Sequence, residues 1–253
     1  MTGGTGTLGK LVVAELRQGG HRARILTRDP RGLVDAMKGD LATGAGLVQA
    51  VDGMEAIVHA ASDTRHPWRG RATDVLGTRR LLAHARDAGV KHIVFVSIVG
   101  IDDVAYSYYR TKLMSEQVVR ENIVPWTILR ATQFHPFIEF LLARFSRMPG
   151  LTAVPTRWLF QPVAAGEVAQ RLVSAVQGAP AGTLPDFGGP EVHDLKALAG
   201  AWLAARKSNR RIVNVPMPLR MSRAIEEGGL TCPDHKDGKV TFAQHLTEKY
   251  ALP

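Results

Sequence analysis

The amino-acid sequence opens with a glycine-rich run that could bind the phosphates of a nucleotide. The run spans residues 2–9, TGGTGTLG, and fits GxGxxG through Gly4, Gly6 and Gly9 or the wider GxxGxxG through Gly3, Gly6 and Gly9. Glycines allow a tight turn and a close approach of the backbone to a diphosphate, and a following helix presents free N–H groups and its positive dipole end. An amphipathic helical pattern follows at once, so we interpret the run as a dinucleotide-binding loop rather than a plain turn.

Tyr108 and Lys112 form a YxxxK pair that could transfer a proton. On a helix, the i, i+4 spacing puts both side chains on one face. Reduction of a carbonyl needs a proton donor, and lowering a tyrosine pKa from near 10 to neutrality takes about 4 kcal/mol. One ammonium group at about 4 Å supplies that much at an effective dielectric constant of about 20. We therefore expect Tyr108 to donate the proton and Lys112 to lower its pKa, with Tyr109 as the alternative donor.

Residues at the end of an expected second strand indicate which dinucleotide the loop prefers. Thr27 and Arg28 stand about twenty residues after the glycines, where the ribose is recognised. An acid there would accept from the 2′-hydroxyl of NAD, whereas arginine offers a planar fork of donors to the 2′-phosphate of NADP. Asp29 follows, but Pro30 indicates that the chain is already turning away. We predict NADP(H), with NADPH preferred over NADH; the alternative is that Arg28 is a solvated charge.

These residues need a framework of alternating strands and helices, and the sequence predicts one. β-Branched runs predict strands at residues 22–28, 34–38, 55–61, 92–97 and 126–131. Amphipathic periodicity predicts helices at residues 7–18, 73–87 and 107–121. This alternation is typical of a parallel sheet covered on both faces, so we expect a Rossmann-like, doubly wound α/β fold.

The apolar stripes of the first two helices predict which side chains face the core. On the first helix the stripe consists of Leu8, Leu11, Val12 and Leu16. On the second it consists of Val75, Thr78, Leu82 and Ala85.

The alternation loosens after Phe134. We therefore divide the chain into a nucleotide-binding part, residues 1–135, and a smaller C-terminal substrate lobe, residues 136–253, that is not an independent domain. Within the lobe we expect helices at residues 166–176, 194–205 and 242–250 and a strand at residues 212–216.

Gln133, Phe134 and His135 follow the strand at residues 126–131. Ligands lie at the carboxyl ends of the strands in open α/β sheets. We expect these three residues to contact the substrate, with plain loop packing as the alternative.

A strand is also expected before the glycine loop, where only Met1 and Thr2 stand. In such a sheet the first strand is central, between the second and the fourth, and its omission would leave two rows of backbone groups unpaired. We therefore expect the first strand to be missing from this chain and the native start to lie several residues upstream. The alternative is a truncated, less stable protein.

Composition and charge exclude several classes of protein. The 253 residues are 45% hydrophobic and 22% charged, so a disordered chain is excluded, and the single cysteine, Cys232, excludes a disulfide scaffold. The net charge of +9 suits an anionic partner. We interpret the basic residues of 206–211 as a solvated C-terminal end of a helix, where positive charge is favoured by the helix dipole. The alternative is a nucleic-acid-binding patch, but no recognised nucleic-acid-binding module accompanies it, so we predict no nucleic-acid partner.

Further absences complete the expected picture. Cys232, Asp234 and His235 lack a second pair of ligands, so we expect no metal. We find no run of 18 apolar residues and no signal peptide, so we expect a soluble cytoplasmic protein without a membrane partner. The sequence leaves the oligomeric state open.

Several ordered motifs give residues 1–135 a resemblance to a known family. Besides the glycine loop they are LTRDP at 26–30, GDL at 39–41, VHAAS at 58–62, SIVGID at 97–102, YYRTK at 108–112 and LRATQFH at 129–135. With these motifs the chain resembles an atypical short-chain dehydrogenase/reductase of the NmrA-like group. The resemblance implies a Rossmann-like fold and an NAD(P) cofactor, and it fades through the C-terminal lobe.

The resemblance also implies roles for individual residues. Asp40 and Leu41 would flank the adenine, and Ala60, Ala61 and Ser62 would line the path to the nicotinamide ribose. Lys112 would bind that ribose, and Ser97 would hydrogen-bond the substrate oxygen. The loop residues expected to contact the cofactor are Gly3, Thr5, Gly6, Thr7, Leu8 and Gly9.

Two functions are compatible with these observations. The first is an NADP(H)-dependent oxidoreductase that transfers hydride to a small carbonyl, quinone or similar acceptor, with Tyr108, Lys112 and Ser97 as its catalytic residues. The second is a non-catalytic redox sensor that binds NADP(H) and acts through a protein partner. The sensor would keep the loop and Arg28 but would not need Tyr108.

Overall fold

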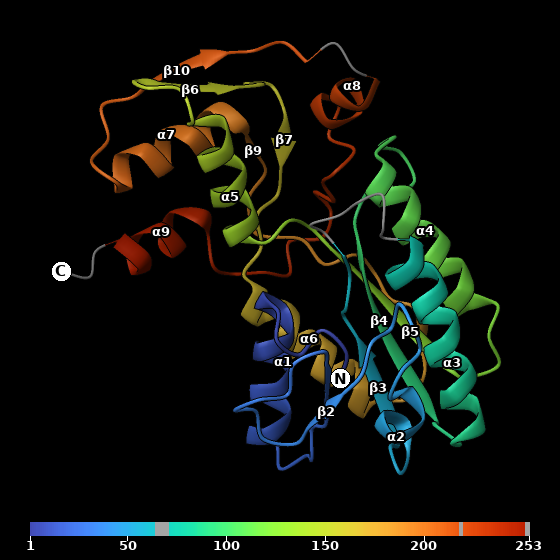
Figure 1. The fold of residues 1–253 in the computed structure, drawn as a ribbon. Coiled ribbons are helices and arrows are strands. Elements are labelled where there is room, and N and C mark those ends of the chain that lie inside the picture. The colour runs from blue at the N-terminus through green and yellow to red at the C-terminus, as the bar shows by residue number, and fades with distance from the viewer. Residues whose placement is uncertain (64–70, 218–219, 251–253) are drawn as a thin grey trace. The chain divides into compact units, whose positions relative to one another are not determined.

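The computed structural model of the chain describes residues 1–63, 71–217 and 220–250, which belong to two compact units (Figure 1). The first unit comprises Met1–Ser97, Tyr106–Arg130 and Ala165–Pro185. The second comprises Ile98–Ala105, Ala131–Ala164 and Asp186–Pro253. The chain therefore passes between the units several times, and this division differs from the single boundary predicted at residue 135.

A parallel sheet forms the framework of the first unit. Strand β1 pairs in parallel with β2, and a second group of strands has the order β3–β4–β5–β8. These strands agree with the β-branched runs of the sequence, apart from the very short β8. Their bounds are Ile25–Thr27 for β1, Ala36–Lys38 for β2, Ala56–His59 for β3, His92–Ile98 for β4, Trp126–Ala131 for β5 and Gly182–Thr183 for β8.

Thr2 joins the two groups of strands. It forms parallel bridges to Leu26 of β1 on one side and to His59 of β3 on the other. Its N–H donates to the carbonyl of Val58 at 3.0 Å, and its carbonyl accepts from the N–H of Ala60 at 3.3 Å. Thr2 thus lies at the central position predicted for the strand before the glycine loop. The resulting order, β2–β1–Thr2–β3–β4–β5–β8, confirms the Rossmann-like fold.

Helices cover both faces of this sheet. Helices α1 and α6 pack together on one face, and α3 and α4 lie on the other, with α2 against α3 (Figure 1). A π-helical turn, η1, runs directly into α3 and also packs against α4. The bounds are Thr7–Gln18 for α1, Leu47–Val51 for α2, Arg71–Leu76 for η1, Gly77–Asp87 for α3, Ser107–Arg120 for α4 and Ala165–Gln177 for α6.

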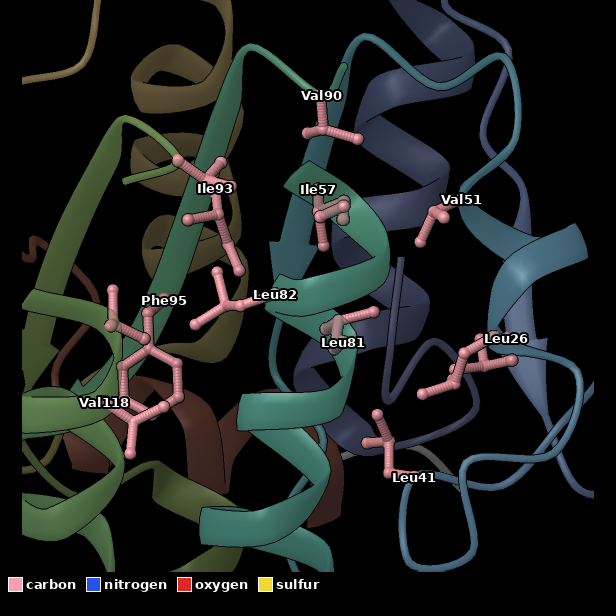
Figure 2. Packing of buried hydrophobic residues seen from close by; sticks show 14 of the residues in the cluster. Leu26, Leu41, Val51, Ile57, Leu81, Leu82, Val90, Ile93, Phe95 and Val118 are labelled. Atoms are coloured by element: carbon pink, nitrogen blue, oxygen red, sulfur yellow. The ribbon is translucent and has the colours of Figure 1, made fainter. Parts of the chain in front are cut away.

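The core on the α3 and α4 side is a continuous apolar cluster (Figure 2). Ile93 and Phe95 of β4 pack with Leu81 and Leu82 of α3 and with Val118 of α4. Every side chain predicted to face the core from residues 73–87 is buried there or beside it. This cluster packs α3 and α4 against strands β3 and β4.

Helix α1 buries a different stripe from the predicted one. Leu8 and Val12 are buried as expected, but Leu11 is 38% exposed and Leu16 is only partly buried, whereas Val13 is fully packed. Val13 lies against Ala23 and Ile25 in a small cluster of its own. The stripe is rotated because α1 has to contact both the sheet and α6, which the periodicity of α1 alone does not reveal.

The second unit contains short strand pairs and further helices. Strand β10 pairs in parallel with β6, and β7 pairs antiparallel with β9. The strands are β6 at Leu151–Val154, β7 at Leu159–Phe160, β9 at His193–Asp194 and β10 at Arg211–Asn214. The helices are α5 at His135–Phe145, α7 at Leu195–Ala205, α8 at Arg220–Glu226 and α9 at Phe242–Tyr250.

Arg210 and Glu139 connect segments of this unit through hydrogen bonds. Arg210 donates to the carbonyl oxygens of Ser146, Met148 and Leu151 at 2.7–3.0 Å, so this member of the basic run is structural rather than solvated. Glu139 of α5 accepts hydrogen bonds from His245, Lys249 and Tyr250, which secures α9. Within the described part of the chain, no helix combines the length and apolar character needed to cross a bilayer.

Candidate functional site

A cavity of about 340 Å³ opens in the first unit at the carboxyl ends of its parallel strands. The segments that follow Thr2, β1, β2 and β3 all contribute to its wall. The predicted cofactor residues in the wall are Gly3, Thr5, Gly6, Arg28, Asp40, Leu41, Ala60, Ala61 and Ser62. The wall also includes Thr2, Leu26, Thr27 and Gly39, which lie within the motifs but were not among the predicted cofactor contacts, and Asp63 and Thr73, which lie outside the motifs.

Four predicted cofactor residues lie outside that wall. Thr7, Leu8 and Gly9 form the first turn of α1, behind the loop. Lys112 is on α4 and is buried, with 4% of its surface exposed. The first-turn N–H groups of α1 still have no partner within the helix, so they remain suited to an anion.

The structure selects one of the two glycine registers. Gly3 adopts a φ of +70°, and a Cβ there would lie 2.7 Å from the backbone nitrogen of Ala61. The N–H of Gly6 donates to the carbonyl of Gly3 at 2.9 Å, and a Cβ on Gly9 would overlap that same carbonyl. Gly4 instead packs against the side chain of Ile25. Gly3, Gly6 and Gly9 therefore make the loop, in the GxxGxxG register.

A second, basic cavity adjoins the first and shares Arg28 with it. Its other lining residues are Asp29, Pro30, Arg31 and Lys38, so positive charges outnumber negative ones. Arg31 forms hydrogen bonds of 2.8 Å and 2.7 Å to the two carboxylate oxygens of Asp29, and they hold the pKa of Asp29 below its usual value. Asp29, the acidic residue that lines this basic cavity, is thus already paired with a neighbouring arginine.

A buried histidine ties Thr2 to helix α3. His59 Nδ1 lies 2.6 Å from Thr2 Oγ1, and His59 Nε2 lies 2.8 Å from Thr78 Oγ1. Thr78 spends its single hydroxyl hydrogen on the carbonyl of Asp74, so His59 donates from Nε2 and accepts at Nδ1. Burial lowers the pKa of His59 to about 3, which keeps the ring neutral. This histidine lies within the VHAAS motif at residues 58–62, but the motif alone assigns it no role.

Tyr108 is joined to the wall of the first cavity by a hydrogen bond. Its hydroxyl lies 3.0 Å from Ser62 Oγ, and Ser62 in turn donates to the carboxylate of Asp74. Tyr109 is buried beside Tyr108 and Tyr106, in contact with both rings. Of the two candidate donors, the structure therefore brings Tyr108 to Ser62. Asp74 went unnoticed in the sequence, although it stands four residues before the buried Thr78.

Lys112 does not act on Tyr108 in the predicted way. Its ammonium donates to the carbonyl of Val96 at 2.6 Å and lies 4.1 Å from the centre of the Phe95 ring. Burial raises the pKa of Tyr108 to about 12, whereas the prediction was a lowered value. Burial also lowers the pKa of Lys112 to about 8, despite the nearby charges of Asp74 and Glu116. Burial removes water from both the Tyr108 phenol and the Lys112 ammonium, and this cost of charging outweighs the attraction between them that was expected from a separation of about 4 Å.

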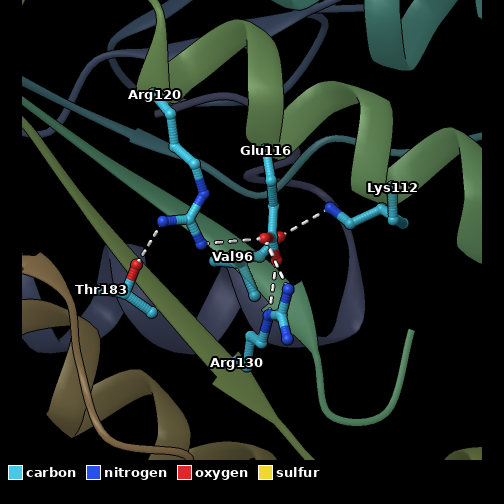
Figure 3. Close-up of polar contacts among 6 residues, drawn as sticks. All are labelled: Val96, Lys112, Glu116, Arg120, Arg130 and Thr183. Carbon is cyan, nitrogen blue, oxygen red and sulfur yellow. Dashed lines mark hydrogen bonds and ion pairs between the residues drawn. The ribbon is translucent and has the colours of Figure 1, made fainter. Parts of the chain in front are cut away.

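A buried carboxylate lies one helical turn after Lys112. Glu116 has only 1% of its side chain exposed and accepts from Arg130 Nε and Nη2, both at 2.8 Å, and from Arg120 at 3.2 Å (Figure 3). Burial alone would raise its pKa, but the hydrogen bonds from Arg130 and Arg120 outweigh that effect and lower the pKa. The predicted catalytic Ser97 is buried, and its hydroxyl oxygen has no hydrogen-bond partner within the described part of the chain.

The predicted substrate residues belong to the second unit. The backbones of Gln133 and His135 pair with Val163, through bonds of 3.0 Å and 3.1 Å. Both side chains are buried, and neither the amide of Gln133 nor Nε2 of His135 has a hydrogen-bond partner within the described part of the chain. Burial and the neighbouring His245 lower the pKa of His135 to about 4. Phe134 precedes α5 as its N-terminal capping residue.

Comparison with protein-family models matches residues 3–136 to the family described as NAD(P)H-binding. The match covers more than half of the chain, and it coincides with the segments that build the two cavities. The chain belongs to this NAD(P)H-binding family.

Relatives and solved structures agree with that assignment. The (4-alkanoyl-5-oxo-2,5-dihydrofuran-3-yl)methyl phosphate reductase of Streptomyces griseus is 30% identical over 142 residues, which are 53% of this chain and 47% of that protein. The chain thus matches about half the length of this curated relative.

Two solved structures share the fold over nearly the whole chain. A short-chain dehydrogenase/reductase superfamily protein of Agrobacterium tumefaciens with bound NAD has a TM-score of 0.74, with 23% identity, covering 99% of this chain and 95% of that one. The NADPH-dependent quinone oxidoreductase QOR2 of Escherichia coli, complexed with NADPH, has a TM-score of 0.78, with 16% identity and 98% coverage of both chains. At these identities the structures show the fold alone, and that fold fits the atypical short-chain dehydrogenase/reductase class predicted from the motifs.

The residues present fit a dinucleotide. A Cβ on Gly3 would lie 2.7–2.8 Å from backbone atoms of Ala60 and Ala61, so only glycine allows the loop to approach these residues this closely. The wall is built from backbone and small residues at the positions where a diphosphate needs a close approach. Gly3, Gly6 and the first turn of α1 would hold the diphosphate, and Arg28 would lie at the adenosine end.

Proposed function

We propose that this chain is an oxidoreductase that uses NADP(H) to reduce a small carbonyl, quinone or similar acceptor. The observation that carries the proposal is the pair of cavities that share Arg28. One is lined by the glycine loop and the strand ends, and the other by Arg28, Arg31 and Lys38. A dinucleotide with an additional phosphate on its adenosine ribose matches this combination of a close backbone approach and excess positive charge.

The preference for NADPH over NADH rests on the charges of the basic cavity. The 2′-hydroxyl of NADH is best recognised by a free carboxylate, and Asp29 is engaged by Arg31. Arg28 is exposed at the end of β1 and can turn its guanidinium towards a phosphate. Arg31 and Lys38 add to the positive potential there.

The chemistry divides between the cofactor and three side chains of this unit. When bound, the reduced nicotinamide supplies a hydride to the acceptor. Tyr108 would give its phenolic proton to the acceptor oxygen, and Ser97 would hold that oxygen by a hydrogen bond. Lys112 would bind the cofactor ribose with the ammonium that now donates to Val96. For the acceptor side we propose Gln133, Phe134 and His135, because two of them carry buried polar atoms suited to a ligand.

Named relatives support reduction as the reaction class. The Streptomyces relative is a reductase, and one structural neighbour is a quinone oxidoreductase crystallised with NADPH. We further propose an NmrA-like membership, a small-molecule acceptor as the only partner, with no nucleic acid or membrane involved, and action in the cytoplasm. A non-catalytic sensor gains no support from these names.

Calorimetry followed by turnover tests the proposal. The full chain is titrated with NADPH and with NADH, and we expect NADPH to bind about tenfold more tightly or better. NADPH oxidation is then followed with a panel of aldehydes, ketones and quinones, and at least one acceptor should be reduced. Absence of heat with both nucleotides would overturn the proposal. Tight binding without any turnover would overturn its catalytic part.

A further inference from the structure

Tyr108, Ser62 and Asp74 form a hydrogen-bonded chain that ends on a buried carboxylate. Ser62 Oγ donates to Asp74 Oδ1, and the hydroxyl of Tyr108 lies 3.0 Å from the same Ser62 Oγ. A serine hydroxyl has one hydrogen. Since Ser62 gives that hydrogen to Asp74, it can only accept from Tyr108. The phenolic hydrogen of Tyr108 therefore points towards Ser62 and is not available to a substrate while Asp74 is ionised.

Protonation of Asp74 reverses the direction of both hydrogen bonds between Asp74, Ser62 and Tyr108. A neutral carboxyl group donates through its O–H, so Ser62 would accept from Asp74 and donate to Tyr108. Tyr108 would then accept from Ser62, and its own hydrogen would be free to point at an acceptor oxygen.

We propose that Asp74 is a positioning residue whose protonation state sets the direction of the Tyr108 hydroxyl and that, when protonated, it resupplies Tyr108 through Ser62. This inference rests on the proposed reduction. It assigns a role to a carboxylate that neither the motifs nor the comparisons single out.

Reduction of the acceptor draws one proton from Tyr108, and Asp74 replaces it through Ser62. Tyr108 breaks its O–H bond and gives the proton to the acceptor oxygen, which has received a hydride from the reduced nicotinamide. Ser62 passes its proton to the phenolate of Tyr108 and takes one from the carboxyl group of Asp74. Asp74 is left as a carboxylate and regains a proton from water. One hydride and one proton reach the acceptor, and every residue returns to its starting state.

The surroundings of Asp74 favour such a role. Asp74 is 2% exposed, and its second oxygen accepts from the backbone N–H of Asp63 at 3.0 Å. Burial raises its pKa, although the hydrogen bonds from Ser62 and Asp63 and the charge of Lys112 oppose the rise. The carboxylate of Asp63 adds to it. The neighbouring His59 is neutral, so it adds no positive charge that would lower the pKa of Asp74.

Nuclear magnetic resonance of tyrosine tests the coupling without cofactor or substrate. The chain has four tyrosines, so ζ-carbon labelling gives a simple spectrum in which Tyr108→Phe identifies the Tyr108 signal. We expect the Tyr108 signal to move in one step during a pH titration, with a midpoint above the ordinary pKa of aspartate. The step should vanish in Asp74→Asn and in Ser62→Ala. It should remain in Asp87→Asn, which removes an exposed carboxylate of α3.

Two outcomes of this titration overturn the inference. One is a Tyr108 signal without any step in the natural chain. The other is a step that persists in Asp74→Asn or in Ser62→Ala. If Asp74→Asn does not fold, as judged by its thermal melt, Ser62→Ala decides the question alone. Removing the Ser62 hydroxyl interrupts the hydrogen bonds between Tyr108 and Asp74 and leaves the Asp74 carboxylate in place.

A pH profile then links the coupling to catalysis. With NADPH and 4-nitrobenzaldehyde, kcat of the natural chain should fall about tenfold per pH unit above the midpoint found for Tyr108. In Asp74→Asn, kcat should not change across the same range. A natural profile without this fall would overturn the role of Asp74 in reduction. Absence of turnover would count against the proposed function, and the titration of the cofactor-free chain would still decide whether Asp74 controls Tyr108.

Discussion

The carbonyl oxygen of Gly3 occupies the position that a Cβ of Gly9 would take. Gly9 is in the first turn of α1, so the helix can start this close to the loop only without a side chain there. The same carbonyl accepts from the N–H of Gly6 at 2.9 Å. The contact between Gly3 and Gly9 therefore holds the N-terminus of α1 against the wall of the nucleotide cavity.

Gly9→Ala should weaken both folding and nucleotide binding. The added methyl group pushes α1 away from the loop, and we expect a loss of about 1–3 kcal/mol in the free energy of unfolding. Urea unfolding and NADPH calorimetry measure the two effects. The control is Gly200→Ala in α7, where a Cβ meets nothing within 4 Å. That variant should be as stable as the natural chain or slightly more stable, since alanine favours helices. Equal effects at the two positions would contradict the steric argument.

Arg28→Ala should change cofactor preference rather than folding. Removing a guanidinium from a phosphate contact costs about 1.4 kcal/mol or more, so the Kd for NADPH should rise at least about tenfold. The Kd for NADH should change little, because NADH lacks the 2′-phosphate. The control is Arg22→Ala, which removes an exposed arginine at the start of residues 22–28, and it should affect neither Kd. A parallel loss for both nucleotides would place Arg28 on the diphosphate instead.

Glu116→Gln should destabilise the first unit strongly. It removes the negative charge that accepts from Arg130 in a site where the glutamate is 1% exposed, and breaking such a buried pair costs about 3 kcal/mol or more. Glu227→Gln, which removes the exposed partner of Arg223, should have no measurable effect. Urea unfolding at neutral pH compares the two variants, and similar midpoints would contradict this prediction.

The destabilisation by Glu116→Gln should depend on pH in a defined direction. The pKa of Glu116 is lowered in the folded chain, so its stabilisation is present above the pKa of an unfolded glutamate, about 4.3. It is lost as the pH falls towards the folded value. The difference between Glu116→Gln and the natural chain should therefore shrink in acid, and a constant difference would exclude the ionised form as its source.

Lys112→Met should stabilise the chain at neutral pH while it abolishes turnover. Burial lowers the pKa of Lys112 to about 8, so the folded chain bears the cost of a buried charge at pH 7. Methionine avoids that cost, and we expect a gain of about 2 kcal/mol after loss of the hydrogen bond to Val96. The unfolded chain holds the extra proton between about pH 8 and pH 10.5, so stability of the natural chain rises with pH in that window. The advantage of Lys112→Met, measured by thermal unfolding, should disappear there, and an advantage that persists would point to packing alone.

Much of the framework was predictable because it depends on local periodicity. Helix α1, strand β5 and helix α9 begin and end at the predicted residues, since each combines an apolar period with clear boundary residues. The glycine loop was also predictable, but the choice between its two registers depended on the contacts of Gly3 and Gly9, which only the structure shows. The buried stripe of α1 was not predictable from the periodicity of α1, because α1 also packs against α6, which lies about 150 residues further along the chain.

By itself, the sequence determined the element types, the parallel α/β framework, the glycine loop and the position of Arg28 beyond it. Only the tertiary structure decided that Ser62 joins Tyr108 to Asp74, that Arg130 pairs with Glu116, and that Asp29 is occupied by Arg31. It also reversed the expected effect on Tyr108, whose pKa is raised. The physical reason is that strand and helix patterns are local, whereas the charge and hydrogen-bond state of a side chain depend on burial and on partners distant in sequence.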